Sequence, residues 1–301
     1  MFDFIGDIHG HADQLQLLFQ KLGYVRSNGM FRHPDRKAFF LGDFVNRGAQ
    51  VRRVLEIVRP MVEANEALAV VGNHEYNLLA YLTDGHDGNP LREHSESNFN
   101  QLKDTLSAFE RDREQLYDYV EWMGTLPLFF ENNRLRVVHA CWDDQQISFI
   151  KNHYSSNKLT DTLLQASAIP DDPAHTAVQV LLKGVEFKLS SQDEWEDADG
   201  NIHQAVRLKW WEYSQGKGIH ELSVRDIQDV DTYPDEEYVR LYPGYPATAP
   251  PVFIGHYCLD GTPRLLKPNV CCVDFCVYRS KRIVAYRWHG EQTLSRDHLV
   301  W

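Results

Sequence analysis

The chain has 301 residues, of which 43% are apolar and 25% are charged, a balance typical of a globular protein with a substantial core. Its 31 basic and 43 acidic residues give a formal net charge of −12, which argues against sequence-independent nucleic-acid binding because that binding requires Lys and Arg to neutralise phosphates. No apolar run approaches the roughly 20 residues of a membrane-spanning helix, so we expect no membrane partner.

The N-terminal segment, residues 1–7, has no basic region followed by a cleavable signal pattern, and we therefore expect a cytoplasmic protein. The cysteine count is odd, and without a secretory signal this predicts reduced thiols. We expect these thiols to be small buried core residues. The five cysteines are Cys141, Cys258, Cys271, Cys272 and Cys276.

Short apolar runs alternate with helical patterns in the first part of the chain. The order of strand, helix and strand predicts an α/β fold with a parallel sheet covered by helices. Strands that are apolar on both faces fit this fold, because such a sheet is buried on both sides. We expect strands at residues 2–6, 38–41 and 67–71, and helices at residues 13–22 and 51–62.

The following segments continue this pattern up to a change of composition near residue 144. Apolar residues between Phe99 and Met123 predict one long amphipathic helix, and alternation over 270–275 and 282–288 predicts a pair of strands. We expect, in chain order, a surface loop at 83–96, the long helix at 99–123, and strands at 135–138, 252–256, 270–275 and 282–288.

The stretch 144–251 is rich in acidic, amide and aromatic residues and ends in a proline-rich segment. We interpret it as an inserted cap or substrate-selecting region, with helices early and a hairpin around 185–211. Its Trp210-Trp211 pair is predicted to lie in a core. The expected organisation is therefore a core in two parts, 1–143 and 252–301, interrupted by the insertion at 144–251.

Five apolar runs end in a residue that can bind a metal ion. In open α/β sheets, ligands bind outside the carboxyl ends of the strands, so we expect these side chains around one crevice. A lone His is usually a surface or core residue, but the joint occurrence at strand ends argues for a site. This mixed nitrogen and oxygen set suits Mn²⁺, Fe or Zn²⁺ better than Ca²⁺ or a structural zinc cage. The candidate ligands are Asp7, His9, Asp43, Asn73, His139 and His256.

The motifs Gly6-Asp7-Ile8-His9-Gly10, Gly42-Asp43-Phe44-Val45-Asn46-Arg47-Gly48 and Gly72-Asn73-His74-Glu75 resemble the calcineurin-like metallophosphoesterase signature. More narrowly, they resemble the phosphoprotein phosphatase branch, which includes Ser/Thr phosphatases, bacterial phosphatases and symmetrical diadenosine tetraphosphate hydrolases. Val138-His139-Ala140 and Gly255-His256 resemble the later two histidine motifs. The resemblance covers about 1–143 and 252–290 and implies an α/β/β/α sandwich of two mixed sheets.

The resemblance also implies the roles of single residues. Asp7, His9 and Asp43 would bind one metal ion. A second ion would be bound by Asp43, which bridges the two, together with Asn73, His139 and His256. The implied general acid is His74 and the implied phosphate clamp is Arg47. The implied cofactors are two divalent metal ions, with Mn²⁺ first and Fe, Ni²⁺ or Zn²⁺ as alternatives.

The function predicted first is a dinuclear metal-dependent phosphatase that acts on phosphomonoesters, either phosphoproteins or small molecules. Two cations about 3.5–4 Å apart would lower the pKa of a bridging water, and the resulting hydroxide would attack phosphorus in line. The alternative is hydrolysis of dinucleoside polyphosphates such as diadenosine tetraphosphate, or of capped RNA ends. A phosphodiesterase or nuclease comes third, and a non-catalytic scaffold is the competing class.

Asn46 departs from the family pattern, which usually has an acid at this position. A carboxylate there would orient the catalytic imidazole and favour its charged form. The amide of Asn46 can accept a hydrogen bond but brings no charge. We therefore expect His74 to be a weaker base than in relatives and to lose its acid form at a lower pH.

The substitution Asn46→Asp tests this interpretation. A carboxylate at residue 46 should raise the pKa of His74, so the acid form should persist to higher pH and the alkaline side of the kcat profile should extend. The measurement is kcat as a function of pH in both proteins. An unchanged profile would contradict the role given to Asn46.

Overall fold

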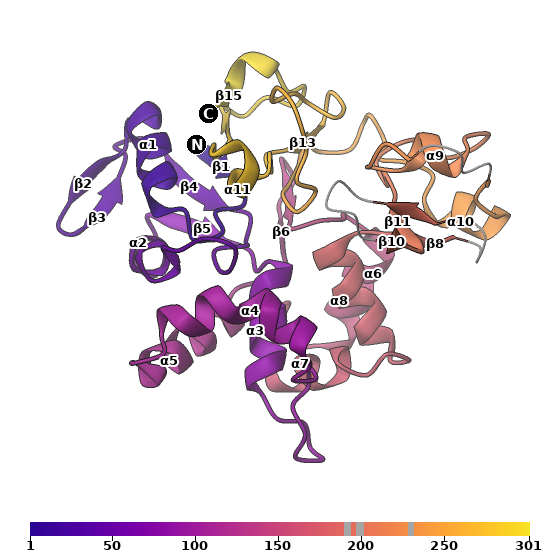
Figure 1. Ribbon diagram of the computed structural model, residues 1–301. Helices are drawn as coiled ribbons and strands as arrows, with labels where there is room; N and C mark the ends of the chain where they lie inside the picture. Colours follow the sequence, from indigo (N-terminus) through magenta and orange to yellow (C-terminus); the bar gives the residue numbers. More distant parts are fainter. Residues whose placement is uncertain (190–193, 197–201, 228–231) are drawn as a thin grey trace. The chain divides into compact units, whose positions relative to one another are not determined.

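The computed structural model describes residues 1–189, 194–196, 202–227 and 232–301 (Figure 1). The chain divides into two compact units. The core unit comprises Met1–Leu182 and Pro250–Trp301, and the second unit comprises Lys183–Ala249. All predicted site residues belong to the core unit.

The core unit carries two large β-sheets, the two-stranded hairpin of β2 and β3, and most of the described helices. Its strands are β1 (Phe2–Ile5), β2 (Val25–Ser27), β3 (Met30–Arg32), β4 (Lys37–Phe40), β5 (Ala67–Ala69), β6 (Phe129–Glu131), β7 (Arg136–Val138), β12 (Val252–Ile254), β13 (Val270–Cys272), β14 (Ala285–Trp288) and β15 (Leu299–Val300). Its helices are α1 (Ala12–Leu22), α2 (Val51–Glu63), α3 (Asn73–Leu82), α4 (Glu96–Ala108), α5 (Arg113–Gly124), α6 (Asp144–His153), α7 (Asp161–Ser167), α8 (Pro173–Lys183), α11 (Val277–Ser280) and the 3-10 helix η1 (Arg296–His298).

The first sheet has five strands in the order β15-β14-β1-β4-β5. β1, β4 and β5 run parallel, as predicted, and the C-terminal strands β14 and β15 add antiparallel pairs on the other side of β1. The beginning and the end of the chain therefore lie in one sheet (Figure 1). The second sheet has the order β13-β12-β7-β6, with β6 antiparallel and the others parallel. The predicted pair of mixed sheets is confirmed.

Aromatic side chains join the inner faces of the two sheets. Phe4 of β1 stacks on Phe253 of β12 with 3.7 Å between ring centroids. Phe39 of β4 meets Phe130 of β6 edge to face at 5.5 Å. Aromatic pairs of this kind add to the free energy gained by burying their area, so the sandwich is held by rings from both sheets.

Helices cover the outer faces of the sandwich. The apolar residues of α1 are buried, and Phe19 packs edge to face against Phe40 of β4. The helix ends where Gly23 adopts a left-handed conformation, in which its N–H bonds the last carbonyls. On the other side, Lys151 of α6 lies over the ring of Phe129 in β6. The layers are therefore ordered helix, sheet, sheet, helix, which is the α/β/β/α sandwich.

Two predictions about secondary structure are wrong. The expected long helix over 99–123 is two helices, α4 and α5, because the side chain of Asp112 accepts the N–H of Gln115 and starts a new helix. Phe109 between them is fully buried, so the apolar spacing continues across the break. The expected strand pair is also wrong, because β13 pairs with β12 and β14 pairs with β1 in the other sheet.

A short hairpin was missed by the sequence analysis. β2 and β3 pair antiparallel around Asn28-Gly29, and both turn residues have positive φ. Asn-Gly is a strong signal for a two-residue hairpin turn, so the dipeptide could have revealed it.

The second unit is smaller and carries short elements. They are β8 (Glu186–Lys188), β9 (Trp195–Glu196), β10 (Ile202–His203), β11 (Ala205–Arg207), α9 (Ile219–Leu222) and α10 (Glu236–Leu241). The antiparallel pair of β8 and β11 lies in the predicted hairpin region, part of which is outside the described residues. Trp210 and Trp211 are both buried, and Trp210 packs edge to face against Tyr245.

The second unit spans fewer residues than the predicted insertion at 144–251, because α6, α7 and most of α8 belong to the core unit. The role of residues 144–251 as a cap stays a prediction. Among the described residues, the structure contains no helix that is both long enough and apolar enough to cross a membrane.

A buried ion cluster lies at the amino end of β1, away from the predicted ligands. Asp3 is fully buried and accepts hydrogen bonds from Arg36 at 2.9 and 3.0 Å, from Arg287 at 3.1 Å and from the hydroxyl of Tyr24 at 3.1 Å. Arg36 also donates to the carbonyls of Phe2 and Trp288. The cluster therefore joins β1 and β14 to the segments before and after the hairpin of β2 and β3.

The substitution Asp3→Asn should lower the free energy of unfolding by about 3–5 kcal/mol, because it leaves the buried guanidinium of Arg36 without its counter-charge. Urea unfolding measures the change. Asp13→Asn is the matched control, because Asp13 and Arg53 form an exposed pair and such a pair contributes less than about 1 kcal/mol. Equal effects of the two substitutions would contradict this role of the cluster.

Candidate metal centre

The ends of five strands converge in the core unit. Asp7 follows β1, Asp43 follows β4, Asn73 follows β5, His139 follows β7 and His256 follows β12. The structure brings all of these predicted ligands together, along with His9.

Asp7, His9 and Asp43 form the first part of the cluster. Nε2 of His9 lies 3.5 Å from Oδ2 of Asp43 and 3.9 Å from Oδ2 of Asp7. Nδ1 of His9 lies 3.0 Å from the carbonyl oxygen of Val45. A His that donates one ring N–H to a carbonyl presents its other nitrogen as a ligand, so His9 is oriented for metal binding.

Asp43, Asn73, His139 and His256 form the second part. Nε2 of His139 lies 3.5 Å from Oδ2 of Asp43 and 3.0 Å from Oδ1 of Asn73. Nδ1 of His256 lies 2.9 Å from the same amide oxygen. Nδ1 of His139 donates to the carbonyl of Leu41, which orients this ring as Val45 orients His9.

The donor set fits divalent cations. Two groups of side chains, His9 with Asp43 and His74, and Asp7 with Asp43 and His139, each place their donor atoms within 4.8 Å of one another. All of these residues are buried, and both groups contain Asp43. Buried carboxylates in contact with imidazoles and an amide oxygen are a ligand set for transition metals. The first group therefore includes His74, the predicted general acid.

Burial and mutual charge determine the protonation of the carboxylates. Burial, followed by the charges of Asp274 and Asp43, raises the pKa of Asp7 well above its usual value. Burial also acts to raise the pKa of Asp43, but His139 and His74 outweigh it and hold that pKa well below its usual value. Asp43 is therefore the charged centre of the cluster. Burial lowers the pKa of His74 well below its usual value, although Asp43 opposes this shift.

Two glycines leave room for carboxylates of neighbouring strands. A Cβ on Gly72 would stand 2.2 Å from Oδ1 of Asp43, and a Cβ on Gly255 would stand 2.3 Å from Oδ1 of Asp7. Neither distance is sterically allowed, so the Gly-Asn-His and Gly-His motifs need glycine for close approach.

Backbone strain is concentrated in the same loops. Non-glycine residues rarely have positive φ, and such strain persists where the surrounding structure enforces it, often at functional sites. Most of the strained residues lie at or beside the cluster. They are His9, Asp43, Asn46, Arg47, His256, Cys258 and Cys276.

Glu75 holds the loop after β4, a role that the sequence analysis did not assign. Its carboxyl group is fully buried and accepts the N–H groups of Gly72 at 3.0 Å, Asp43 at 2.7 Å, Phe44 at 2.9 Å and Val45 at 3.2 Å. Burial and the charge of Asp43 raise the pKa of Glu75 to about 7. Its place in the motif Gly72-Asn73-His74-Glu75 was the available signal.

Asn46 and Arg47 follow Asp43 in this loop. From the sequence, the amide of Asn46 can accept a hydrogen bond, but in the structure its nitrogen Nδ2 faces Nδ1 of His74 at 2.9 Å. Arg47 is exposed, and its guanidinium lies over the ring of Tyr278 at 4.5 Å from the centroid. Tyr278 was not anticipated from the sequence.

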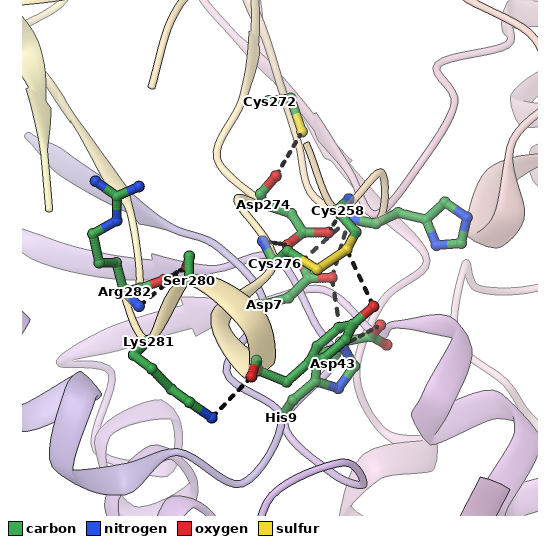
Figure 2. Close-up of a disulfide and its surroundings, with 12 residues drawn as sticks. Asp7, His9, Asp43, Cys258, Cys272, Asp274, Cys276, Ser280, Lys281 and Arg282 are labelled. Carbon is green, nitrogen blue, oxygen red and sulfur yellow. Dashed lines mark hydrogen bonds and ion pairs between the residues drawn. A yellow bond between two sulfur atoms is a disulfide. The ribbon is translucent and has the colours of Figure 1, made fainter. Parts of the chain in front are cut away.

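A disulfide lies beside the cluster, so the predicted reduced state of all five cysteines is wrong. Cys258 and Cys276 are bonded, while Cys141, Cys271 and Cys272 are free and buried. Figure 2 shows the disulfide next to the carboxyl groups of Asp7 and Asp274. Asp274 accepts the N–H groups of both bonded cysteines. The tertiary structure brings the two cysteines together, which neither an odd count nor the spacing reveals.

Comparisons with known proteins add to this geometry. The family model described as calcineurin-like phosphoesterase matches residues 1–258. Bis(5'-nucleosyl)-tetraphosphatase PrpE [asymmetrical] from Anoxybacillus flavithermus is 45% identical over 75 residues, which are 25% of this chain and 31% of that protein. The protein of the same name from Halalkalibacterium halodurans is 43% identical over 82 residues, 27% of this chain and 33% of that protein. The matches thus span about a third of these curated relatives.

A solved structure of a protein serine/threonine phosphatase from Saccharomyces cerevisiae aligns with 99% of this chain and 78% of its own chain, at 16% identity and a TM-score of 0.46.

The substitution Glu75→Gln should weaken Mn²⁺ binding by about 10- to 100-fold, the range typical of groups that orient metal ligands. The new NH₂ group would face backbone N–H donors in place of one acceptor oxygen, which also costs about 1–3 kcal/mol of stability. Isothermal titration and urea unfolding provide the two measurements. The control is Glu96→Gln on the exposed first turn of α4, expected to change neither. Wild-type metal affinity in Glu75→Gln would refute this role.

Proposed function

The chain belongs to the calcineurin-like phosphoesterase family, and on this basis we propose that it is a dinuclear metal-dependent phosphatase that hydrolyses phosphomonoesters. The observation that carries the proposal is the buried cluster in which two overlapping groups of donor atoms share Asp43. The division of ligands between the ions follows the family motifs and not these two groups, so that one ion would be held by Asp7, His9 and Asp43. The other would be held by Asp43, Asn73, His139 and His256.

When bound, the divalent cations would supply Lewis-acid stabilisation of phosphoryl oxygens and would lower the pKa of a water molecule. The protein supplies orientation. Val45 and Leu41 fix the rings of His9 and His139 through their carbonyls, and Glu75 fixes the loop that carries Asp43. These contacts hold the ligands before substrate arrives, which reduces reorganisation during reaction.

Two further side chains are proposed to act on the substrate. The exposed guanidinium of Arg47 has a planar fork that can hold two phosphate oxygens. The Tyr278 ring beneath it restricts its position. His74 lies beside Asp43 and His9 and is proposed to donate a hydrogen bond to the leaving oxygen. Asn46 contacts His74 and acts through it.

The alternative function is hydrolysis of a dinucleoside polyphosphate. It is supported by the similarity to two curated proteins that are both named as bis(5'-nucleosyl)-tetraphosphatases. Manganese as the native metal, a cytoplasmic location and a substrate-selecting role for residues 144–251 are further proposals from the sequence. A non-catalytic scaffold is the competing class, and measurement of tightly bound metal on the purified protein would separate it from an enzyme.

The decisive experiment compares Mn²⁺-dependent turnover of p-nitrophenyl phosphate and diadenosine tetraphosphate. We expect release of p-nitrophenol that is abolished by chelation of the metal and reduced at least about a hundredfold in Asp43→Asn, because that substitution weakens both metal sites. Asp118→Asn removes an exposed carboxylate and should retain wild-type activity.

Preferred cleavage of the dinucleotide would place the alternative first. An absence of turnover on both substrates, with metal bound, would refute the phosphomonoesterase proposal in this form.

A further inference from the structure

Thr105 is a buried polar residue with no role in the metal centre described above. It lies on the inner face of α4, where its neighbours Leu102 and Leu106 are also buried. Within the described part of the chain, its hydroxyl makes two hydrogen bonds, and both go to Asn46, which is 59 positions away in the sequence. The backbone N–H of Asn46 lies 3.0 Å from Oγ1 of Thr105, and the side-chain oxygen Oδ1 of Asn46 lies 2.6 Å from it.

The chemistry of these two contacts determines which way the amide of Asn46 points. The backbone N–H can only donate, so Oγ1 of Thr105 accepts there and its own hydrogen is available for the side chain. A distance of 2.6 Å is typical of an O–H···O bond, whereas N–H···O bonds cluster near 2.9–3.0 Å. The amide oxygen therefore faces Thr105, and the amide nitrogen is the atom that faces Nδ1 of His74 at 2.9 Å.

We propose that Thr105, acting through Asn46, is a positioning residue that holds His74 in the tautomer with its hydrogen on Nε2. The NH₂ group of Asn46 is a donor, so Nδ1 of His74 must accept with its lone pair. The hydrogen of the neutral ring is then on Nε2, the nitrogen left for the substrate. A carboxylate at position 46 would demand the opposite, a hydrogen on Nδ1.

This inference rests on the proposed function for its chemical consequence. With Nδ1 occupied as an acceptor, His74 can donate a hydrogen bond from Nε2 to the leaving oxygen but cannot give up that proton without becoming an imidazolate. The oxygen of a water molecule bonds to phosphorus and loses a proton to solvent. At the same time the bond from phosphorus to the leaving oxygen breaks, and its electron pair stays on that oxygen. The leaving group takes its own proton from water afterwards.

The substrate class follows from this step. Leaving groups that are weak bases, such as phenolates or the phosphate of an anhydride, can depart without protonation. Alkoxides from serine or threonine residues are strong bases and depend on a general acid, which typically contributes 10²- to 10⁴-fold. The site should therefore favour aryl phosphates and phosphoanhydrides over alkyl phosphomonoesters.

The first test reads the tautomer directly and does not depend on activity. In the full-length protein loaded with Zn²⁺, ¹⁵N NMR of labelled histidines at one fixed pH should show His74 with an unprotonated Nδ1 and a protonated Nε2. The His74→Gln spectrum assigns the signal. Thr105→Val should move hydrogen onto Nδ1, Thr105→Ser should restore the wild-type pattern, and Thr125→Val, the same change at the residue that follows α5, should leave it unaltered. A protonated Nδ1 in the wild type, or no change in Thr105→Val, overturns the proposal.

The second test reads the chemistry with a series of aryl phosphates. The wild-type kcat should fall by at least about a hundredfold from p-nitrophenyl to phenyl phosphate, because no general acid compensates for the stronger base. Asn46→Asp should reduce this dependence. If kcat depends equally weakly on the basicity of the leaving group in both proteins, the inference that the leaving group departs without protonation is wrong. A wild-type protein that hydrolyses none of the series would refute the proposed function, while the NMR experiment alone would still decide the role of Thr105.

Discussion

The buried carboxylate of Asp43 is the group on which the rest of the centre depends. Its Oδ2 lies 3.5 Å from ring nitrogens of His9 and His139, and its Oδ1 accepts the backbone N–H of His74 at 2.9 Å. A charge taken out of water costs several kcal/mol unless nearby charges and hydrogen bonds compensate. The surrounding chain must therefore supply donors on every side of this one group, and most features of the site can be understood as ways of doing so.

The backbone around Asp43 is shaped for that purpose. The carboxyl group of Glu75 accepts hydrogen bonds from four backbone N–H groups in the loops after β4 and β5. Because Glu75 satisfies these donors, the carboxylate of Asp43 can face the imidazoles. Gly72 removes the Cβ that would otherwise collide with it. Asp43, Asn46 and Arg47 all have positive φ, because their side chains point in different directions within one short loop.

The two sheets and the helices contribute different parts of the chemistry. The strand ends present the candidate ligands, because β1, β4, β5, β7 and β12 all finish at the same cluster of side chains. The first turn of α3 carries His74, and α4 carries Thr105, which contacts Asn46 beside His74, so helices hold the ring proposed to be catalytic. Under the proposals made above, metal affinity and the choice of leaving group could change independently. An alteration of α4 reaches His74 through Asn46 without touching a ligand.

The sequence by itself determined the fold class and the order in which the candidate ligands follow the strands. Each apolar run ends at glycine and a polar residue, and this local pattern is enough to place Asp7, Asp43, Asn73, His139 and His256 at strand ends. Three features were decided by tertiary structure alone. The direction of the Asn46 amide depends on Thr105, which is 59 positions distant. The other two are the disulfide of Cys258 with Cys276 and the placement of β13 and β14 in separate sheets. Local periodicity records which face of an element is buried, but it carries no information about which distant segment covers that face.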